Sequence, residues 1–191
     1  MIENKFEEAW KSFCEYYKNS RKAFEDFDKR SEFHGPHFRE ESDIVFHLAR
    51  FCYDSFGDGY VHLESPIYKM YFSILEQEPE PKKRRVDIEI SSPESFMTKD
   101  SKRQVFAEMK WVWRGINKYR GGSYLKNMIT GIENDLEKLQ YLHEKGCCES
   151  AFMCIIDEEP ELTQINQQRK LKWEQTYNQV KVLLQSYHGP L

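Results

Sequence analysis

Apolar residues recur every three or four positions in four stretches of the chain, which is the spacing of helices that bury one face. The predicted helices cover residues 5–22, 39–55, 125–145 and 162–187. The first carries the aromatic residues Phe6, Trp10, Phe13 and Tyr17, and further apolar residues extend it toward residue 30. We expect this aromatic face either to pack on the domain's own core or to cover a partner. A turn at His34 to His37 separates the first helix from the second.

Shorter apolar stretches have the pattern of strands. The predicted strands cover residues 60–64, 85–90, 104–112 and 151–157. The last of these is a continuous apolar run, typical of a strand that is buried on both faces. Residues 67–75 fit either an extended run or a short helix, and polar loops are predicted at 76–83, around Pro93 and at 114–124. The order of the elements predicts a single α/β domain over residues 1–191, with a small mixed β-sheet flanked by helices.

Charged residues interrupt two of the predicted strands. Asp87 lies between Val86 and Ile88. Glu108 and Lys110 share one face of the strand over 104–112, because successive side chains of a strand point to opposite faces. Charges on a half-buried sheet cost free energy unless they are paired or hold a metal. The two strands therefore carry a candidate site, and the alternative is an amphipathic hairpin whose charged face meets water.

The composition indicates a folded protein in water. Hydrophobic residues make up 39% of the chain and charged residues 31%, and the mean hydropathy is −0.79. No apolar run approaches the length of a membrane span, and the first ten residues lack the features of a signal peptide. The five cysteines form no CxxC pair. We therefore expect reduced thiols, a cytoplasmic location and no membrane partner.

The net charge of −4 hides a local asymmetry. From Pro81 to Lys126 the chain has 12 Lys and Arg against 5 Asp and Glu. Such a basic segment inside an acidic protein indicates either a local site for an anion or a solvated loop. The sequence has no glycine-rich phosphate loop and no Cys/His set with metal-ligand spacing, which disfavours nucleotide and zinc enzymes.

The carboxylates on the two strands are of the type that binds hard divalent cations. Asp87 and Glu108 could converge on Mg²⁺ or Mn²⁺, with the backbone carbonyl of Met109 as a further ligand. Lys110 could then orient an attacking water or neutralise developing negative charge. Glu41 shares the inward face of the second helix, and it is either a further ligand or a first-turn carboxylate favoured by the helix dipole.

The order of these residues resembles the PD-(D/E)XK nuclease superfamily. The resemblance rests on helical Glu41, strand residue Asp87 and the Glu108-x-Lys110 motif, followed by a helix and a buried strand, and it covers roughly residues 39–157. It implies a restriction-endonuclease-like core, to which residues 1–30 and 162–187 add extra N- and C-terminal helices. It also implies metal ligands at Asp87 and Glu108, a catalytic lysine at Lys110 and a helical carboxylate at Glu41. The optional proline before the aspartate is replaced here by Val86.

The resemblance further implies metal-dependent phosphodiester cleavage, usually of DNA. Asp135 and Lys138 look like residues of the following helix, where a polar side chain often faces the substrate. The basic residues expected to hold the phosphodiester backbone are Lys118, Arg120, Lys126 and Lys138. A homodimer is one way to cut both strands, and either terminal helix could supply its interface. The alternative function is a non-catalytic binding or assembly subunit with a nuclease-like fold.

Overall fold

The computed structural model describes residues 2–31, 41–57, 60–67, 72, 75, 85–97, 101–112, 123–158 and 165–187. Within these ranges the strands are β1 (Val61–Pro66), β2 (Arg85–Ile90), β3 (Arg103–Val112), β4 (Cys148–Asp157) and β5 (Val180–Ser186). The helices are α1 (Ile2–Ser31), α2 (Glu41–Phe56), α3 (Pro93–Met97), α5 (Ser123–Glu144) and α7 (Gln167–Thr176). The prediction of an α/β fold with a mixed sheet flanked by helices is confirmed.

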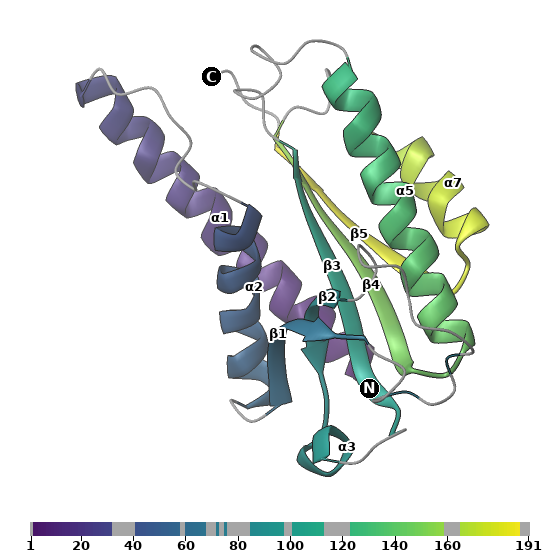
Figure 1. The fold of residues 1–191 in the computed structure, drawn as a ribbon. Coiled ribbons are helices and arrows are strands. Elements are labelled where there is room, and N and C mark those ends of the chain that lie inside the picture. The colour runs from purple at the N-terminus through teal and green to yellow at the C-terminus, as the bar shows by residue number, and fades with distance from the viewer. Residues whose placement is uncertain are drawn as a thin grey trace.

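The five strands form one sheet in the order β1-β2-β3-β4-β5. β2 is antiparallel to both β1 and β3, whereas β4 is parallel to both β3 and β5. Helices α1 and α2 lie on one side of the sheet and α5 and α7 on the other (Figure 1). The central strands β3 and β4 are therefore covered on both faces, which explains their nearly continuous apolar sequences.

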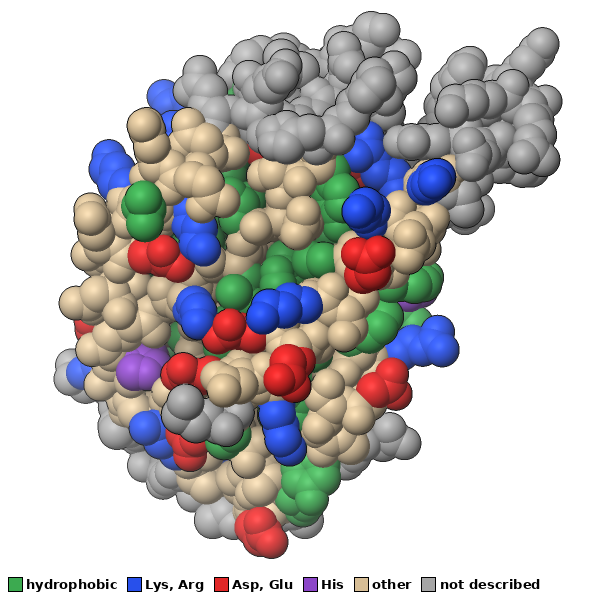
Figure 2. All heavy atoms as spheres, turned by 180° about the vertical axis from the view of Figure 1, so that it is seen from behind, with side chains coloured by type: hydrophobic (Ala, Val, Ile, Leu, Met, Phe, Trp, Pro, Cys, Tyr) green, Lys and Arg blue, Asp and Glu red, His purple; other side chains and the backbone are tan. Residues whose placement is uncertain are grey.

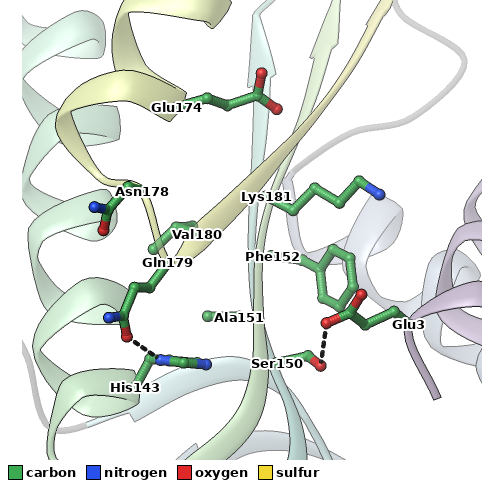
Figure 3. Close-up of a pocket in the computed structure, with 10 residues that line it drawn as sticks. All are labelled: Glu3, His143, Ser150, Ala151, Phe152, Glu174, Asn178, Gln179, Val180 and Lys181. Atoms are coloured by element: carbon green, nitrogen blue, oxygen red, sulfur yellow. Dashed lines mark hydrogen bonds between the residues drawn. The ribbon is translucent and has the colours of Figure 1, made fainter. Parts of the chain in front are cut away.

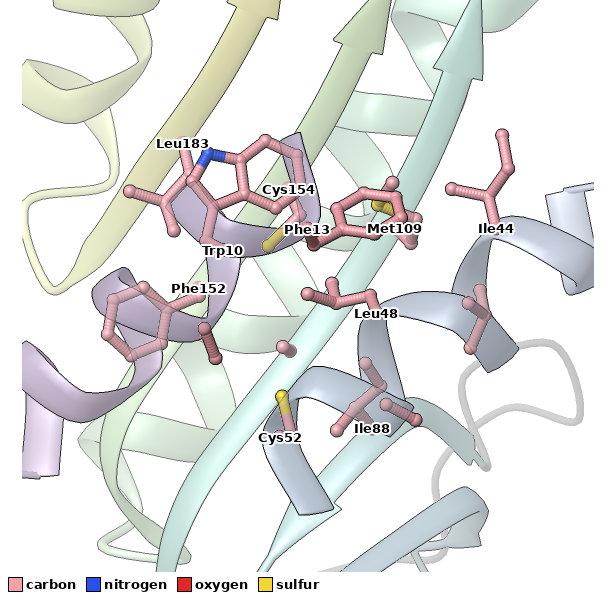
Figure 4. Packing of buried hydrophobic residues seen from close by; sticks show 14 of the residues in the cluster. Trp10, Phe13, Ile44, Leu48, Cys52, Ile88, Met109, Phe152, Cys154 and Leu183 are labelled. Carbon is pink, nitrogen blue, oxygen red and sulfur yellow. The ribbon is translucent and has the colours of Figure 1, made fainter. Parts of the chain in front are cut away.

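The aromatic face of α1 packs on the domain's own core. Phe6, Phe13 and Tyr17 are fully buried, and the ring of Phe6 stacks on that of Phe152 in β4 with a centroid separation of 4.4 Å. Figure 4 shows α1 and α2 side chains, among them Phe13 and Leu48, meeting the apolar face of the sheet. Of the two alternatives expected for this face, the structure shows packing on the domain's own core.

The opposite face of the sheet is covered by α5. Its buried residues keep the predicted spacing of three and four: Ile132, Leu136, Leu139 and Leu142. They belong to one apolar cluster with residues of β4 and β5, including Met153, Ile155 and Val182. The spacing of apolar residues thus placed this helix correctly to within two residues at each end.

The prediction of one helix over residues 162–187 is wrong. The described part of this region contains the shorter helix α7, which starts after the N-cap Asn166, and the strand β5. Val180 and Val182 are buried and flank the exposed Lys181, a period-two pattern that suits a strand. Leu171, which helped to suggest the long helix, is 56% exposed. Parallel pairing with β4 overrides the helical spacing, because it buries the β-branched residues.

A smaller correction concerns the segment around Pro93, which was predicted as a loop. Residues Pro93–Met97 form α3, and the hydroxyl of Ser92 accepts a hydrogen bond from the Ser95 amide at 3.1 Å, as an N-cap does. The predicted turn at 34–37, the loop at 76–83 and most of the basic connection at 114–124 lie outside the described residues. Of the stretch 67–75, only residues 67, 72 and 75 are described.

The C-terminus of α5 requires a glycine, because the backbone there has a positive φ. Gly146 has a φ of +75° and follows the last turn of the helix, where the amide of Cys147 bonds back to the carbonyl of Leu142 at 2.9 Å. We expect Gly146→Ala to lower the free energy of unfolding by about 1 kcal/mol or more, because an L side chain is strained at this φ.

Gly131 is the matched control, because it lies inside the same helix and a Cβ added there meets nothing within 4 Å. We expect Gly131→Ala to raise the free energy of unfolding by about 0.5–1 kcal/mol. Urea unfolding of both variants measures these changes, and two changes of the same sign would contradict this account of the α5 terminus.

Candidate functional site

The candidate site forms where β2 separates from β3. The two strands pair only over residues 88–90 of β2 and 105–107 of β3. On its other side β3 stays paired with β4 as far as Val112. In the described part of the chain, the last residues of β3 therefore have no strand partner on the β2 side. Their backbone groups need other hydrogen-bonding partners, because they are buried.

Two carboxylates supply those partners. The amide of Met109 donates to Oδ2 of Asp87 at 2.7 Å, and the amide of Trp111 donates to Oε2 of Glu41 at 3.1 Å. Asp87 comes from the start of β2, before its pairing with β3 begins, and Glu41 comes from the first turn of α2. The gap between the strands thus brings a strand carboxylate and a helix carboxylate to one edge. Glu41 thus lies in the first turn of α2 and also faces inward, with its carboxylate on β3.

Lys110 and Glu108 project from β3 toward α5. Nζ of Lys110 lies 3.2 Å from Oε1 of Glu41 and 3.1 Å from Oδ2 of Asp135. Nζ of Lys138 lies 2.5 Å from Oε1 of Glu108 and 3.4 Å from Oδ1 of Asp135. The five side chains form a continuous series of alternating charges, which we call the site network: Glu41, Lys110, Asp135, Lys138 and Glu108. Asp135 is the link between its two lysines.

The environment of the site's carboxylates disfavours their ionised form. Burial raises the pKa of Glu108 well above its ordinary value, and the nearby charge of Asp87 raises it further. Burial likewise raises the pKa values of Asp87 and Glu41, although hydrogen bonds from β3 amides oppose this. Additional positive charge placed between Asp87 and Glu108 would therefore be stabilising.

The two lysines are held in their charged form. Burial alone lowers the pKa of Lys110, but the carboxylates of Glu41 and Asp135 outweigh it, so the pKa lies above its ordinary value. The same balance, dominated by Glu108 and Asp135, raises the pKa of Lys138. Both ammonium groups therefore remain positively charged at neutral pH and can stabilise negative charge near them.

The structure brings together most of the predicted site residues. Asp87, Glu108, Lys110 and Glu41 lie in one place, and Glu108 is only 3% exposed, so the alternative of a hairpin with a charged face toward water is wrong. Of the basic residues predicted to hold substrate, Lys126 is exposed on α5. Lys138, by contrast, is buried in the site network. Lys118 and Arg120 lie outside the described residues.

The backbone of Met109 faces the same edge as Asp87. Its amide donates to that carboxylate, and the N–H and C=O of one strand residue point to the same side. The predicted carbonyl ligand is therefore directed toward the gap between β2 and β3. The Met109 side chain lies on the other face, in the core beneath α1 and α2.

Sequence reasoning missed two buried polar clusters. Glu89, in β2, is 2% exposed, and its Oε1 lies 2.7 Å from Nε of Arg103. On the other face, Glu158 accepts hydrogen bonds from Tyr17 and from the indole of Trp111. These contacts join residues far apart in sequence, and no local sequence pattern predicts them.

A separate hollow of about 440 Å³ lies at the other end of the sheet and contains none of the predicted site residues. It is lined by Ser150 and His143 among others, but the two are not joined (Figure 3). Ser150 donates to Glu3 at 3.1 Å, and His143 is bonded to Gln179 and to the Glu149 carbonyl. Within the described residues, Ser150 thus lacks the histidine base that a serine nucleophile requires.

The molecular surface gives no single-sign patch on the face drawn in Figure 2. Lys and Arg side chains alternate there with Asp and Glu side chains, and apolar side chains lie between them. The basic excess between Pro81 and Lys126 falls partly on residues that are not described.

Three further observations bear on identity. None of the described helices is long and apolar enough to cross a membrane. No group of three or more His, Cys, Asp or Glu side chains arranged to hold a metal ion occurs among the described residues. The chain matches no model of a known protein family, and no match is found among curated proteins or among solved structures.

Proposed function

We propose that the protein is a metal-dependent nuclease that hydrolyses phosphodiester bonds, with DNA as the expected substrate. The observation that carries the proposal is the convergence of Asp87, Glu108, Lys110 and Glu41 where β2 separates from β3. The succession α2, β1, β2, β3, α5 and β4, with β3 and β4 parallel, supports a restriction-endonuclease-like core. In this proposal α1, α7 and β5 are additions to that core.

The residues of the site fit a hard divalent cation such as Mg²⁺ or Mn²⁺. In the described part of the chain, Oδ1 of Asp87 and Oε2 of Glu108 have no hydrogen-bond or ion-pair partner. Together with the carbonyl of Met109, they make a set of oxygen donors of the kind that these ions prefer. Two carboxylates are sufficient, because Mg²⁺ keeps several waters and binds substrate phosphate. When bound, the ion supplies Lewis acidity and a more acidic water.

Lys110 is the proposed catalytic residue that acts on the attacking water and the phosphate. Its ammonium stays charged and is fixed by Glu41 and Asp135 on two sides. A fixed cation stabilises negative charge that develops on the phosphoryl oxygens without having to reorganise during the reaction. Glu41 is proposed as a positioning residue, since it holds both Lys110 and the end of β3.

Substrate binding is proposed to depend on Lys126 and on two basic residues that come before it in the sequence. Lys126 is exposed on the first turns of α5, and Lys118 and Arg120 precede that helix in the sequence. Contacts of lysine and arginine with backbone phosphates are independent of base sequence and weaken as salt is added. The proposal therefore includes binding to DNA that is sensitive to salt and shows no strong sequence preference.

The test is a cleavage assay with purified full-length chain. Supercoiled plasmid, linear duplex, single-stranded DNA and RNA are incubated with Mg²⁺ or Mn²⁺, and an excess of EDTA serves as the control. We expect metal-dependent cleavage of at least one DNA substrate and none with EDTA. Intact substrates under all conditions, with protein shown to be folded, would contradict the proposal.

A second candidate function is a non-catalytic binding or assembly subunit. It is favoured by one observation: Glu108 is already paired with Lys138 and does not need a metal to balance its charge. A protein with this function would bind no Mn²⁺ in calorimetry and would form a stable complex in a pull-down. Such a result, combined with intact nucleic acid, would replace the first proposal with the second.

A further inference from the structure

Lys138 occupies an unusual position for a lysine of a proposed DNA-binding surface. It is 6% exposed, and its ammonium lies 2.5 Å from a carboxylate oxygen of Glu108. It comes from the middle of α5, where the apolar residues on either side, Leu136 and Leu139, are packed into the core. Its reach toward β3 is therefore fixed by the packing of the whole helix. This side chain is part of the interior of the site rather than of its surface.

We infer that Lys138 acts as an internal cation that competes with the divalent ion for Glu108, so that its ammonium opposes metal binding at that carboxylate and shifts toward its other partners when the ion binds. The inference rests on the proposed function. It assigns Lys138 a positioning role and does not make it a substrate ligand.

The geometry allows the ammonium to leave Glu108 without losing all of its partners. Besides Glu108, Nζ of Lys138 donates to the carbonyl of Arg85 at 3.0 Å and lies 3.4 Å from Oδ1 of Asp135. An ammonium has three donor hydrogens, so these two partners can be kept while the third is given up. Glu108 would then exchange one cationic partner, the Lys138 ammonium, for another, the divalent ion.

Asp135 links this exchange to the proposed catalytic lysine. Its two oxygens contact the two lysines separately: Oδ1 lies near Lys138 and Oδ2 lies 3.1 Å from Lys110. A Lys138 ammonium that moves toward Asp135 adds positive charge beside the contact that holds Lys110. The carbonyl of Arg85 also ties Lys138 to the start of β2, two residues before Asp87. Lys138 is thereby connected to both strands of the site.

The two states differ in what balances the charge of Glu108. Without metal, the Lys138 ammonium keeps a fully buried carboxylate from being unpaired, which would cost the folded protein stability. With metal, the same ammonium opposes binding, because it occupies one oxygen and repels a second cation. Removal of the ammonium should therefore lower the stability of the metal-free protein and raise its affinity for the metal.

The test measures Mn²⁺ binding by calorimetry, and thermal unfolding with EDTA or with Mn²⁺, for wild type and two variants. Lys138→Met keeps the unbranched chain and removes the charge, whereas Lys138→Gln keeps a hydrogen-bond donor and is the variant to use if Lys138→Met does not fold. We expect both to bind Mn²⁺ at least tenfold more tightly than wild type, or about 1.4 kcal/mol in binding free energy. Their Tm in EDTA should fall, and Mn²⁺ should raise it more than it raises that of wild type.

Lys172→Met is the matched control, because Lys172 is exposed on the neighbouring helix α7 and the charge change is identical. It should leave the Mn²⁺ affinity unchanged. Equal or weaker Mn²⁺ binding by the Lys138 variants, with normal binding by wild type, would overturn the competition and leave the nuclease proposal standing. Absence of Mn²⁺ binding in wild type and in both variants would overturn both proposals.

Discussion

The substitution Asp87→Asn is expected to lower the rate of Mg²⁺-dependent DNA cleavage by roughly 10³-fold and to leave the protein folded. A neutral amide holds a divalent cation far less well than a carboxylate does. The amide oxygen can still accept the hydrogen bond of the Met109 amide, which Asp87 now accepts at 2.7 Å. The measurement compares initial cleavage rates and the free energy of unfolding in urea, which we expect to change by less than about 1 kcal/mol.

Glu64→Gln supplies the control for this substitution. Glu64 lies on β1, next to β2, and its side chain is 61% exposed, so the same chemical change is made outside the site. We expect cleavage by this variant to equal that of wild type. Cleavage by the Asp87→Asn protein at the wild-type rate would remove Asp87 from the proposed metal site.

The largest expected effect on stability comes from Phe13→Ala. Phe13 is fully buried in α1 and lies among other rings, 5.7 Å from Trp10 and 6.2 Å from Phe51 between ring centroids. Its truncation leaves a cavity between two helices and the sheet that cannot close without moving them. We expect the free energy of unfolding to fall by about 3–5 kcal/mol, as measured by urea unfolding.

Phe46→Ala is the matched control, because Phe46 is on α2 and is 58% exposed. The same truncation there should change the free energy of unfolding by less than about 0.5 kcal/mol. A loss at Phe13 as small as that at Phe46 would contradict the expected contribution of α1 packing to stability. A small loss at Phe13 would revive the alternative that the aromatic face of α1 covers a partner.

Local patterns in the sequence were sufficient where one chain segment determines its own structure. Strands β2 and β3 and the residues Asp87, Glu108 and Lys110 on them could be predicted, because misplaced charges in apolar strands are visible without any tertiary information. The helix α5 could be predicted for the same reason, since the apolar residues of its core face recur every three or four positions. The fold class follows from the order of such elements.

Features that depend on distant partners could not be predicted. The strand β5 exists because parallel pairing with β4 buries Val180 and Val182, and its short sequence fits a helix almost as well. From the sequence, Lys138 is indistinguishable from a surface lysine, because its carboxylate partner Glu108 lies thirty positions earlier in the chain. The pairing of Glu89 with Arg103 was hidden in the same way.

The separation of β2 from β3 also bears on how such a domain changes over evolutionary time. Because Asp87 fills a gap in strand pairing, its loss to an apolar residue would leave a buried amide without a partner, whereas a change to asparagine would not. A gene copy can therefore lose the proposed chemistry in one conservative step and still encode a folded protein. In terms of the proposed function, a single conservative substitution separates an active nuclease from an inactive protein with the same fold.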